Sequence, residues 1–94
     1  MKTIFEWIKE KTPRCSFIKK RMNDDVLIIC AESQMIYYLN STAALFVELA
    51  DGKTTVESIK NKFLEKYDVE EDELERDLIE VIRDLQWKKI LTLE

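Results

Sequence analysis

The feature that most constrains this chain is the stretch from Met35 to Ile59, in which one structural element leads into the next with almost no loop. Its first five residues, Met35–Leu39, are rich in β-branched and aromatic side chains and predict a strand. Asn40-Ser-Thr42 follows, with side chains that can accept hydrogen bonds from the free N–H groups of a helix start. The apolar run 43–50 then predicts a helix that is buried on most sides.

Residues that typically end or begin helices predict two further helices. Asp51-Gly52 holds the only glycine of the chain, at a place where the end of a helix favours a left-handed residue. Thr54-x-x-Glu57 predicts a capping box that opens a second, amphipathic helix ending near Tyr67. A third helix is predicted over 71–88; its acidic first turns and its basic end both complement the helix dipole.

The N-terminal third predicts a short helix and a hairpin. The segment 2–10 has an amphipathic pattern that Pro13 ends, and it suits either a docking arm or extra core lying across the sheet. The segments 16–21 and 26–31 flank a polar turn at 22–25 and predict a β-hairpin. Because 26–31 is continuously apolar, we expect the middle strand of a sheet that is covered on both faces.

These elements define one α+β domain over residues 1–94, with a three-stranded antiparallel sheet followed by a three-helix bundle in a winged-helix-like arrangement. The predicted parts are a helical extension (1–13), the sheet (16–39), three helices (41–89) and an extended tail (90–93). Ninety-four residues are enough for a single modest core.

Composition argues against catalysis and against a metal site. The chain has no histidine, which removes the commonest general base and metal ligand. Cys15 and Cys30 form no Cys-x-x-Cys motif, and we expect two small buried thiols near each other across the hairpin. A single glycine rules out a glycine-rich phosphate loop. We therefore predict that the protein alone is not an enzyme and holds no metal or cofactor.

Charge and hydropathy bear on location and partners. Charges at Glu6, Lys9 and Glu10 interrupt any signal-peptide core, and no apolar run approaches the ~18 residues of a membrane span, so we expect a cytoplasmic protein with no membrane partner. Residues 1–22 carry a net charge of +5, whereas 23–94 carry −9. The segment 70–84 in the third helix has eight acidic and two basic residues, so it would repel nucleic-acid phosphates.

Five sequence pieces in order resemble the PqqD family of peptide-recognition proteins. They are Leu39-Asn40-x-Thr42-Ala43, Leu49-x-Asp51-Gly52, Thr55-Val56-x-x-Ile59, Tyr67-x-Val69 and Leu74-x-x-Asp77-Leu78. The resemblance covers about Ser33 to Leu91. In the family the third helix often closes with a glycine, where this chain has Trp-Lys-Lys-Ile at 87–90.

The resemblance implies that the protein binds the leader segment of a ribosomally made precursor peptide and presents it to a modifying enzyme, such as a radical-SAM enzyme or a leader peptidase. The peptide would add as a strand to the third strand, beside the third helix. The implied contacts are Met35, Ile36, Tyr37, Tyr38, Leu39, Asp77, Leu78, Val81, Asp84, Leu85 and Lys88.

Two other hypotheses fit the same elements. One is a winged-helix protein that binds nucleic acid through the third helix; the other is a structural subunit that scaffolds an enzyme without touching the peptide. On the third helix, Leu74, Leu78, Val81 and Leu85 share a stripe, with Ile82 at its shoulder. For most of them plain core is the better interpretation, and only one or two need line a groove. Strand alternation predicts that Tyr37 points inward with Leu39 and that Tyr38 points outward.

Overall fold

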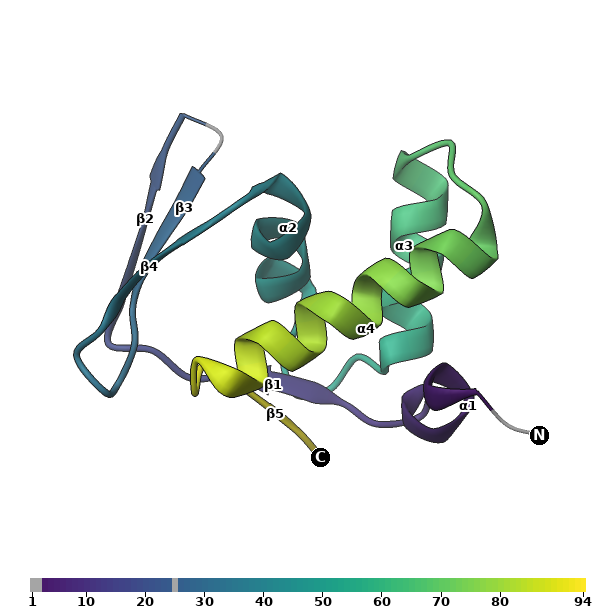
Figure 1. Ribbon diagram of the computed structural model, residues 1–94, viewed down its shortest axis with the longest axis horizontal. Helices are drawn as coiled ribbons and strands as arrows, with labels where there is room; N and C mark the ends of the chain where they lie inside the picture. Colours follow the sequence, from purple (N-terminus) through teal and green to yellow (C-terminus); the bar gives the residue numbers. More distant parts are fainter. Residues whose placement is uncertain (1–2, 25) are drawn as a thin grey trace.

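The computed structural model describes residues 3–24 and 26–94, which form an α+β fold with a three-stranded antiparallel sheet and four helices (Figure 1). The elements in chain order are α1 Ile4–Ile8, β1 Pro13–Cys15, β2 Lys19–Asn23, β3 Val26–Cys30, β4 Ile36–Leu39, α2 Ser41–Leu49, α3 Val56–Lys66, α4 Glu71–Trp87 and β5 Leu91–Leu93. The expected helix over 2–10 and turn over 22–25 each include a residue, Lys2 and Asp25, that lies outside the described residues.

The three-stranded sheet is a meander in the order β2-β3-β4, and the helices lie to one side of it (Figure 1). Leu27 and Ile29 of β3 face these helices and are buried, while Val26, Ile28 and Cys30 point the other way and are more exposed. The expectation of a middle strand covered on both faces is therefore wrong. The short helix α1 does not lie across the sheet; it packs against α4 and buries Phe5 there.

A second, two-stranded sheet joins the two ends of the fold. β1 pairs antiparallel with β5, with Pro13 opposite Leu93. The flanking residues Thr12 and Glu94 exchange two backbone hydrogen bonds of 3.0 Å. This pairing was not predicted from the sequence, which placed the first strand at 16–21 instead of β1 and β2.

The helix caps fix how the chain turns from the sheet into the helices. Asn40 caps α2 as expected, its Oδ1 accepting from the Ala43 N–H at 2.9 Å. The cap of α3 is Thr55, whose Oγ1 accepts from the Ser58 N–H at 3.1 Å, so the predicted capping box was one residue too early. The backbone N–H of Thr54 is already bound by Asp51 at 2.8 Å.

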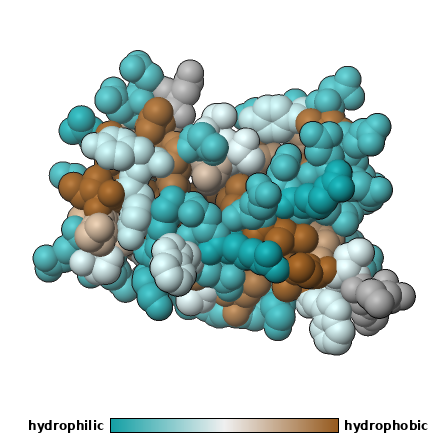
Figure 2. Space-filling view, viewed as in Figure 1, coloured by the Kyte–Doolittle hydropathy of each residue, from teal (hydrophilic) through white to brown (hydrophobic). Residues whose placement is uncertain are grey.

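The core lies where α4 crosses α2 and α3, while hydrophilic side chains cover much of the molecule's outside (Figure 2). Leu74, Leu78, Ile82 and Leu85 form the buried stripe of α4. Ile82 thus takes the place predicted for Val81, which is half-buried on the shoulder of the stripe. None of the described helices is both long enough and apolar enough to cross a membrane.

The end of α4 depends on a non-glycine residue in the left-handed conformation. Lys89 has φ 62°, and the following N–H, that of Ile90, donates to the Leu85 carbonyl at 2.9 Å. This is the hydrogen bond that usually accompanies a glycine after a helix end. The turn delivers Ile90 into the core, with no exposed area, and starts β5.

Candidate functional site

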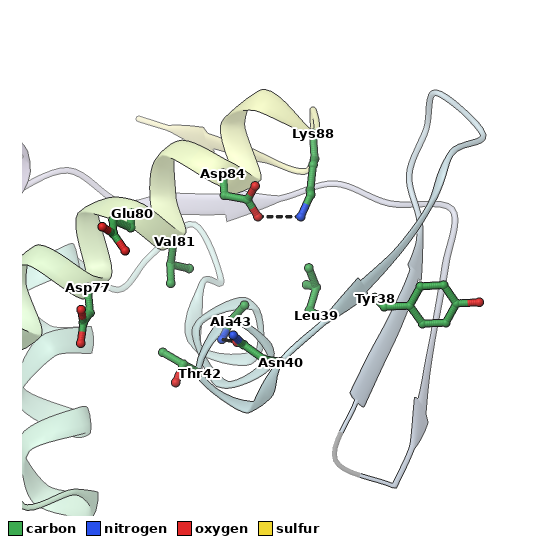
Figure 3. A pocket seen from close by; sticks show the side chains of 10 residues that line it. All are labelled: Tyr38, Leu39, Asn40, Thr42, Ala43, Asp77, Glu80, Val81, Asp84 and Lys88. Atoms are coloured by element: carbon green, nitrogen blue, oxygen red, sulfur yellow. Dashed lines mark hydrogen bonds and ion pairs between the residues drawn. The ribbon is translucent and has the colours of Figure 1, made fainter.

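A groove lies between β4, the first turn of α2 and one side of α4 (Figure 3). We call it the β4–α4 groove, and its volume is about 390 Å³. Its lining residues are Tyr38, Leu39, Asn40, Thr42, Ala43, Asp77, Glu80, Val81, Asp84 and Lys88. The path of the chain explains why these residues lie together. β4 forms one wall, the start of α2 forms the floor, and α4 lies across both.

The α4 wall is a single helical face. Asp77, Glu80, Val81, Asp84 and Lys88 are spaced by three and four residues, which places their side chains in one row. The buried stripe of α4 anchors this row against the core. The row therefore stands on a helix that is packed against the core.

The β4 wall alternates between the groove and the opposite face of the sheet. Leu39 points toward α4, whereas Tyr38 points away from it (Figure 3). Leu39 is 2% exposed and Tyr38 is 69% exposed, and Tyr37 is half-buried. The predicted inward direction of Tyr37 and Leu39 and outward direction of Tyr38 are confirmed.

The main chain of β4 has one partner strand and one open edge. The Ala31 N–H donates to the Met35 carbonyl at 2.9 Å, so these two residues form a hydrogen-bonded pair. Such pairs alternate with non-bonded pairs along an antiparallel ladder. By the register, Tyr37 and Leu39 bond to β3, and the N–H and C=O groups of Ile36 and Tyr38 point toward the open edge.

The α4 wall carries a negative charge. This wall holds three carboxylates, those of Asp77, Glu80 and Asp84, and one cation, Lys88. The Lys88 Nζ lies 2.6 Å from Asp84 Oδ2 and 5.3 Å from the centre of the Tyr37 ring. Lys88 therefore ties the α4 wall to the β4 wall at one end of the groove, and the carboxylates of Asp77 and Glu80 occupy the other end.

The side chains of the groove are of the kinds that bind ligands. The chain has no histidine. Among the residues that the structure describes, no group of three or more His, Cys, Asp or Glu side chains is placed to hold a metal ion. The groove lining contributes carboxylates, one amine, two hydroxyls, one amide and apolar surface, which are groups that recognise a ligand by hydrogen bonds, charge and shape.

The far side of α4 is fixed by a buried cation. The Lys60 Nζ lies 2.6 Å from Glu71 Oε1, 3.2 Å from Glu75 Oε2 and 5.0 Å from the centre of the Phe5 ring. Burial alone would lower the pKa of Lys60, but the hydrogen bonds and charges of the two carboxylates outweigh it and raise the pKa. This cluster joins α1, α3 and α4 and holds the α4 wall from behind.

The two cysteines do not form the predicted pair across the hairpin. Cys15 lies in β1 opposite Leu91, whereas Cys30 lies in β3 between Lys19 and Ile36. Both are free thiols and both are half-buried. Burial raises the pKa of Cys15 to about 11, with a small opposing effect from Lys20. The raised pKa disfavours the reactive thiolate form of Cys15 at neutral pH.

Six of the residues implied by the resemblance line the groove: Tyr38, Leu39, Asp77, Val81, Asp84 and Lys88. Tyr37 lies beside it through its contact with Lys88, while Met35 and Ile36 are exposed outside the lining. Leu78 and Leu85 are not exposed at all, so we assign them to the core that supports α4. Four lining residues were missed: Asn40, Thr42, Ala43 and Glu80. Of these, Glu80 follows Asp77 by three residues, and that spacing could have revealed it.

Comparison with known proteins identifies the chain's relatives. The family model of coenzyme PQQ synthesis protein D, PqqD, matches residues 26–91. Among solved structures, the fold is similar to that of TbiB1 in complex with the TbiA(beta) leader peptide, with a TM-score of 0.70 and 20% sequence identity. The alignment covers 81% of this chain and 93% of that one. No curated protein matches the chain in a sequence search.

Proposed function

Since the chain belongs to the PqqD family, that of coenzyme PQQ synthesis protein D, we propose that it binds the leader segment of a ribosomally synthesised precursor peptide and presents it to a modifying enzyme. The leader would add to the open edge of β4 as a fourth strand of the sheet. TbiB1, whose fold is similar, has been solved with a leader peptide.

The observation that carries this proposal is the coincidence of an open strand edge with a groove. Ile36 and Tyr38 present main-chain donors and acceptors at that edge, and a peptide in extended conformation can bond to them. The adjoining α4 wall then selects side chains. Main-chain bonds supply sequence-independent affinity, and the groove supplies specificity.

The chemistry of the groove predicts the kind of leader. Leu39, Ala43 and Val81 offer apolar surface, while Asp77 and Glu80 offer carboxylates. Because alternate side chains of a strand point to the same face, we expect an apolar residue and a basic residue two positions apart in the leader. A leader with an acidic residue facing Asp77 would be disfavoured by charge repulsion.

The protein is proposed to act as a binding partner in the cytoplasm and to have no catalytic activity of its own. The modifying enzyme would be a radical-SAM enzyme or a leader peptidase, and it would take the leader-bound form as substrate. We also propose that residues 1–94 act as one recognition domain. Elemental analysis of the purified protein should find no stoichiometric zinc or iron, and a value near one metal ion per chain would contradict this.

A nucleic-acid role is disfavoured by charge. In the winged-helix-like interpretation, which we retain only as a description of shape, α4 would be the recognition helix. It carries acidic side chains along its length, and those of Asp77, Glu80 and Asp84 point into the groove. We expect no sub-micromolar binding of duplex DNA at ~0.15 M salt.

The decisive experiment is a titration of the isotope-labelled protein with the leader of the precursor encoded beside its gene. We expect an affinity in the nanomolar to micromolar range, about −8 to −12 kcal/mol. Backbone amide shifts should change most in β4, in the α2 cap and along the 77–88 face of α4. Changes confined to β1, α1 or α3 would contradict the assigned site. The absence of any leader binding would favour the structural-subunit hypothesis.

A further inference from the structure

The face of the three-stranded sheet that points away from the helices is a second candidate binding surface. We call it the outer face, and its eight described side chains are Lys19, Arg21, Asn23, Val26, Ile28, Cys30, Ile36 and Tyr38. The strand register lines them up across the sheet, with Arg21 beside Ile28 and Ile28 beside Tyr38. In the view of Figure 2, one group of apolar side chains lies on the left, where Figure 1 shows the sheet, and another lies at the lower right.

The outer face is more apolar than a solvated sheet face should be. Antiparallel sheets with one side in water normally place polar residues on that side. Here every outward side chain of β3 and β4 is apolar or aromatic, and Ile36 and Tyr38 are 59% and 69% exposed. A row of exposed apolar side chains is typical of a surface that another protein covers.

The charges on the outer face point to the chemistry of that partner. Lys19 and Arg21 are its two charged residues, and none of the eight described side chains is acidic, although the whole chain has a net charge of −4. A second copy of this chain would bring two pairs of cations together, which is unfavourable. Nucleic acid would meet mostly apolar surface. A protein surface with apolar side chains bordered by carboxylates fits both features.

We propose that the outer face docks the modifying enzyme that acts on the bound leader, through an apolar patch of that enzyme bordered by carboxylates. The identity of this partner rests on the function proposed above. The arrangement allows both partners to bind together. The leader occupies the edge of β4 and the groove on the helix side, which leaves the opposite side of the sheet uncovered.

The test compares two charge reversals at neighbouring positions of β2. Arg21 belongs to the outer face, whereas Lys20 lies opposite the buried Ile29 and points to the helix side. Arg21→Glu and Lys20→Glu change the net charge equally. Binding to the purified modifying enzyme encoded beside this gene should weaken about tenfold for Arg21→Glu and less than twofold for Lys20→Glu.

A third variant tests the apolar part. Ile28→Thr keeps a β-branched side chain in the strand but places a hydroxyl at the centre of the outer face, and it should weaken enzyme binding about fivefold. The leader affinity of all three variants should stay within twofold of the wild type, because none of these residues lies at the β4 edge. Circular dichroism should show the wild-type spectrum for each variant.

The outcomes separate this proposal from the function on which it rests. Equal enzyme binding by Arg21→Glu, Ile28→Thr and the wild type would overturn the outer-face proposal, even if the leader binds. Failure of the wild type to bind leader would overturn the proposed function, while the enzyme titration without leader still tests the outer face. Sedimentation equilibrium that shows a wild-type dimer dispersed by Ile28→Thr would assign the face to a second copy instead.

Discussion

The two edges of the three-stranded sheet differ in charge and in composition. β2 forms one edge with the sequence KKRMN and is exposed along its whole length, whereas β4 forms the other with IYYL. Each edge adjoins a hollow: about 390 Å³ beside β4, and about 460 Å³ between β2, α2 and the end of α3. The β4 hollow has three carboxylates against one amine, while the β2 hollow has Lys20, Arg21 and Lys66 against Glu48.

This difference gives two reasons to expect a peptide at one edge and not at the other. Lysines on an edge strand discourage the addition of another strand, and β2 carries two of them. β2 also lies outside the region matched by the PqqD family model, whereas β4 and α4 lie within it. These differences favour the β4 edge in the proposed leader site, and variants at the two edges can contradict that proposal.

Proline substitutions at the two edges should give the largest difference. Ile36→Pro removes an N–H that points to the open edge of β4, and its ring obstructs an added strand. We expect leader affinity to fall at least tenfold, or about 1.4 kcal/mol, by calorimetric titration. Lys20→Pro is the matched control, because the register points the Lys20 N–H to the open edge of β2. If Lys20→Pro abolished leader binding and Ile36→Pro did not, the leader would bind at the edge of β2 and not at that of β4.

Tyr37→Pro separates the added strand from the sheet itself. The Tyr37 N–H bonds to β3, so this substitution removes a bond inside the sheet. We expect it to lower the free energy of unfolding by about 3 kcal/mol, measured by urea denaturation. Ile36→Pro should lower it by less than half as much, and equal losses would contradict the assigned hydrogen-bond register.

Charge reversals in the two hollows should give an intermediate difference. Asp84→Lys removes the partner of Lys88 and places a cation in the α4 wall, and Asp77→Lys reverses the charge at the other end. We expect each to weaken binding of a basic leader about fivefold, with a smaller effect at high salt. Glu48→Lys, the same charge change in the β2 hollow, should leave leader affinity unchanged. If only Glu48→Lys lowered leader affinity, the result would show that the leader binds in the β2 hollow.

The opposite shoulder of α4 should give the smallest effect. Trp87 is 85% exposed and adjoins Gln86 in a separate hollow with Arg83 and Lys89. Trp87→Ala and Gln86→Lys should change leader affinity less than twofold. Glu75 is unsuitable as a control on this side of α4 because its carboxylate lies 3.2 Å from the Lys60 amine. A tenfold loss from either variant would show that the wrong side of α4 was assigned.

Local patterns predicted the parts of the fold that depend on near neighbours. The Asn40 cap, the β3–β4 hairpin and the direction of Leu39 all follow from residues a few positions apart. Other features depend on distant contacts. β1 and β5 are three residues each and meet only in the folded chain, so no local signal predicts their pairing, although an extended tail was expected over 90–93. The cap of α3 moved from Thr54 to Thr55 because Asp51 binds the Thr54 amide.

The site was predicted in part for the same reason. The resemblance to the PqqD family implied six of the lining residues, on β4 and along α4 from Asp77. Helical spacing alone could not decide between Val81 and Ile82, which are 100° apart, and the packing of α4 placed Ile82 in the core and Val81 at the groove. Thr42 and Ala43 were recognised as part of a helix start, but only the tertiary fold brings that start beneath α4.

The β1–β5 pairing has a consequence for the order of folding. Pro13 and Leu93, which face each other in this ladder, are 80 positions apart in the chain. Closing a loop of this length costs about 2 kcal/mol more in chain entropy than closing one of ten residues. The few hydrogen bonds of a three-residue ladder offset little of this entropy loss. The hairpins and helices should therefore form first and the β1–β5 ladder last. By the same reasoning the ladder should open first under mild denaturant, leaving the strand and helix of the groove in place.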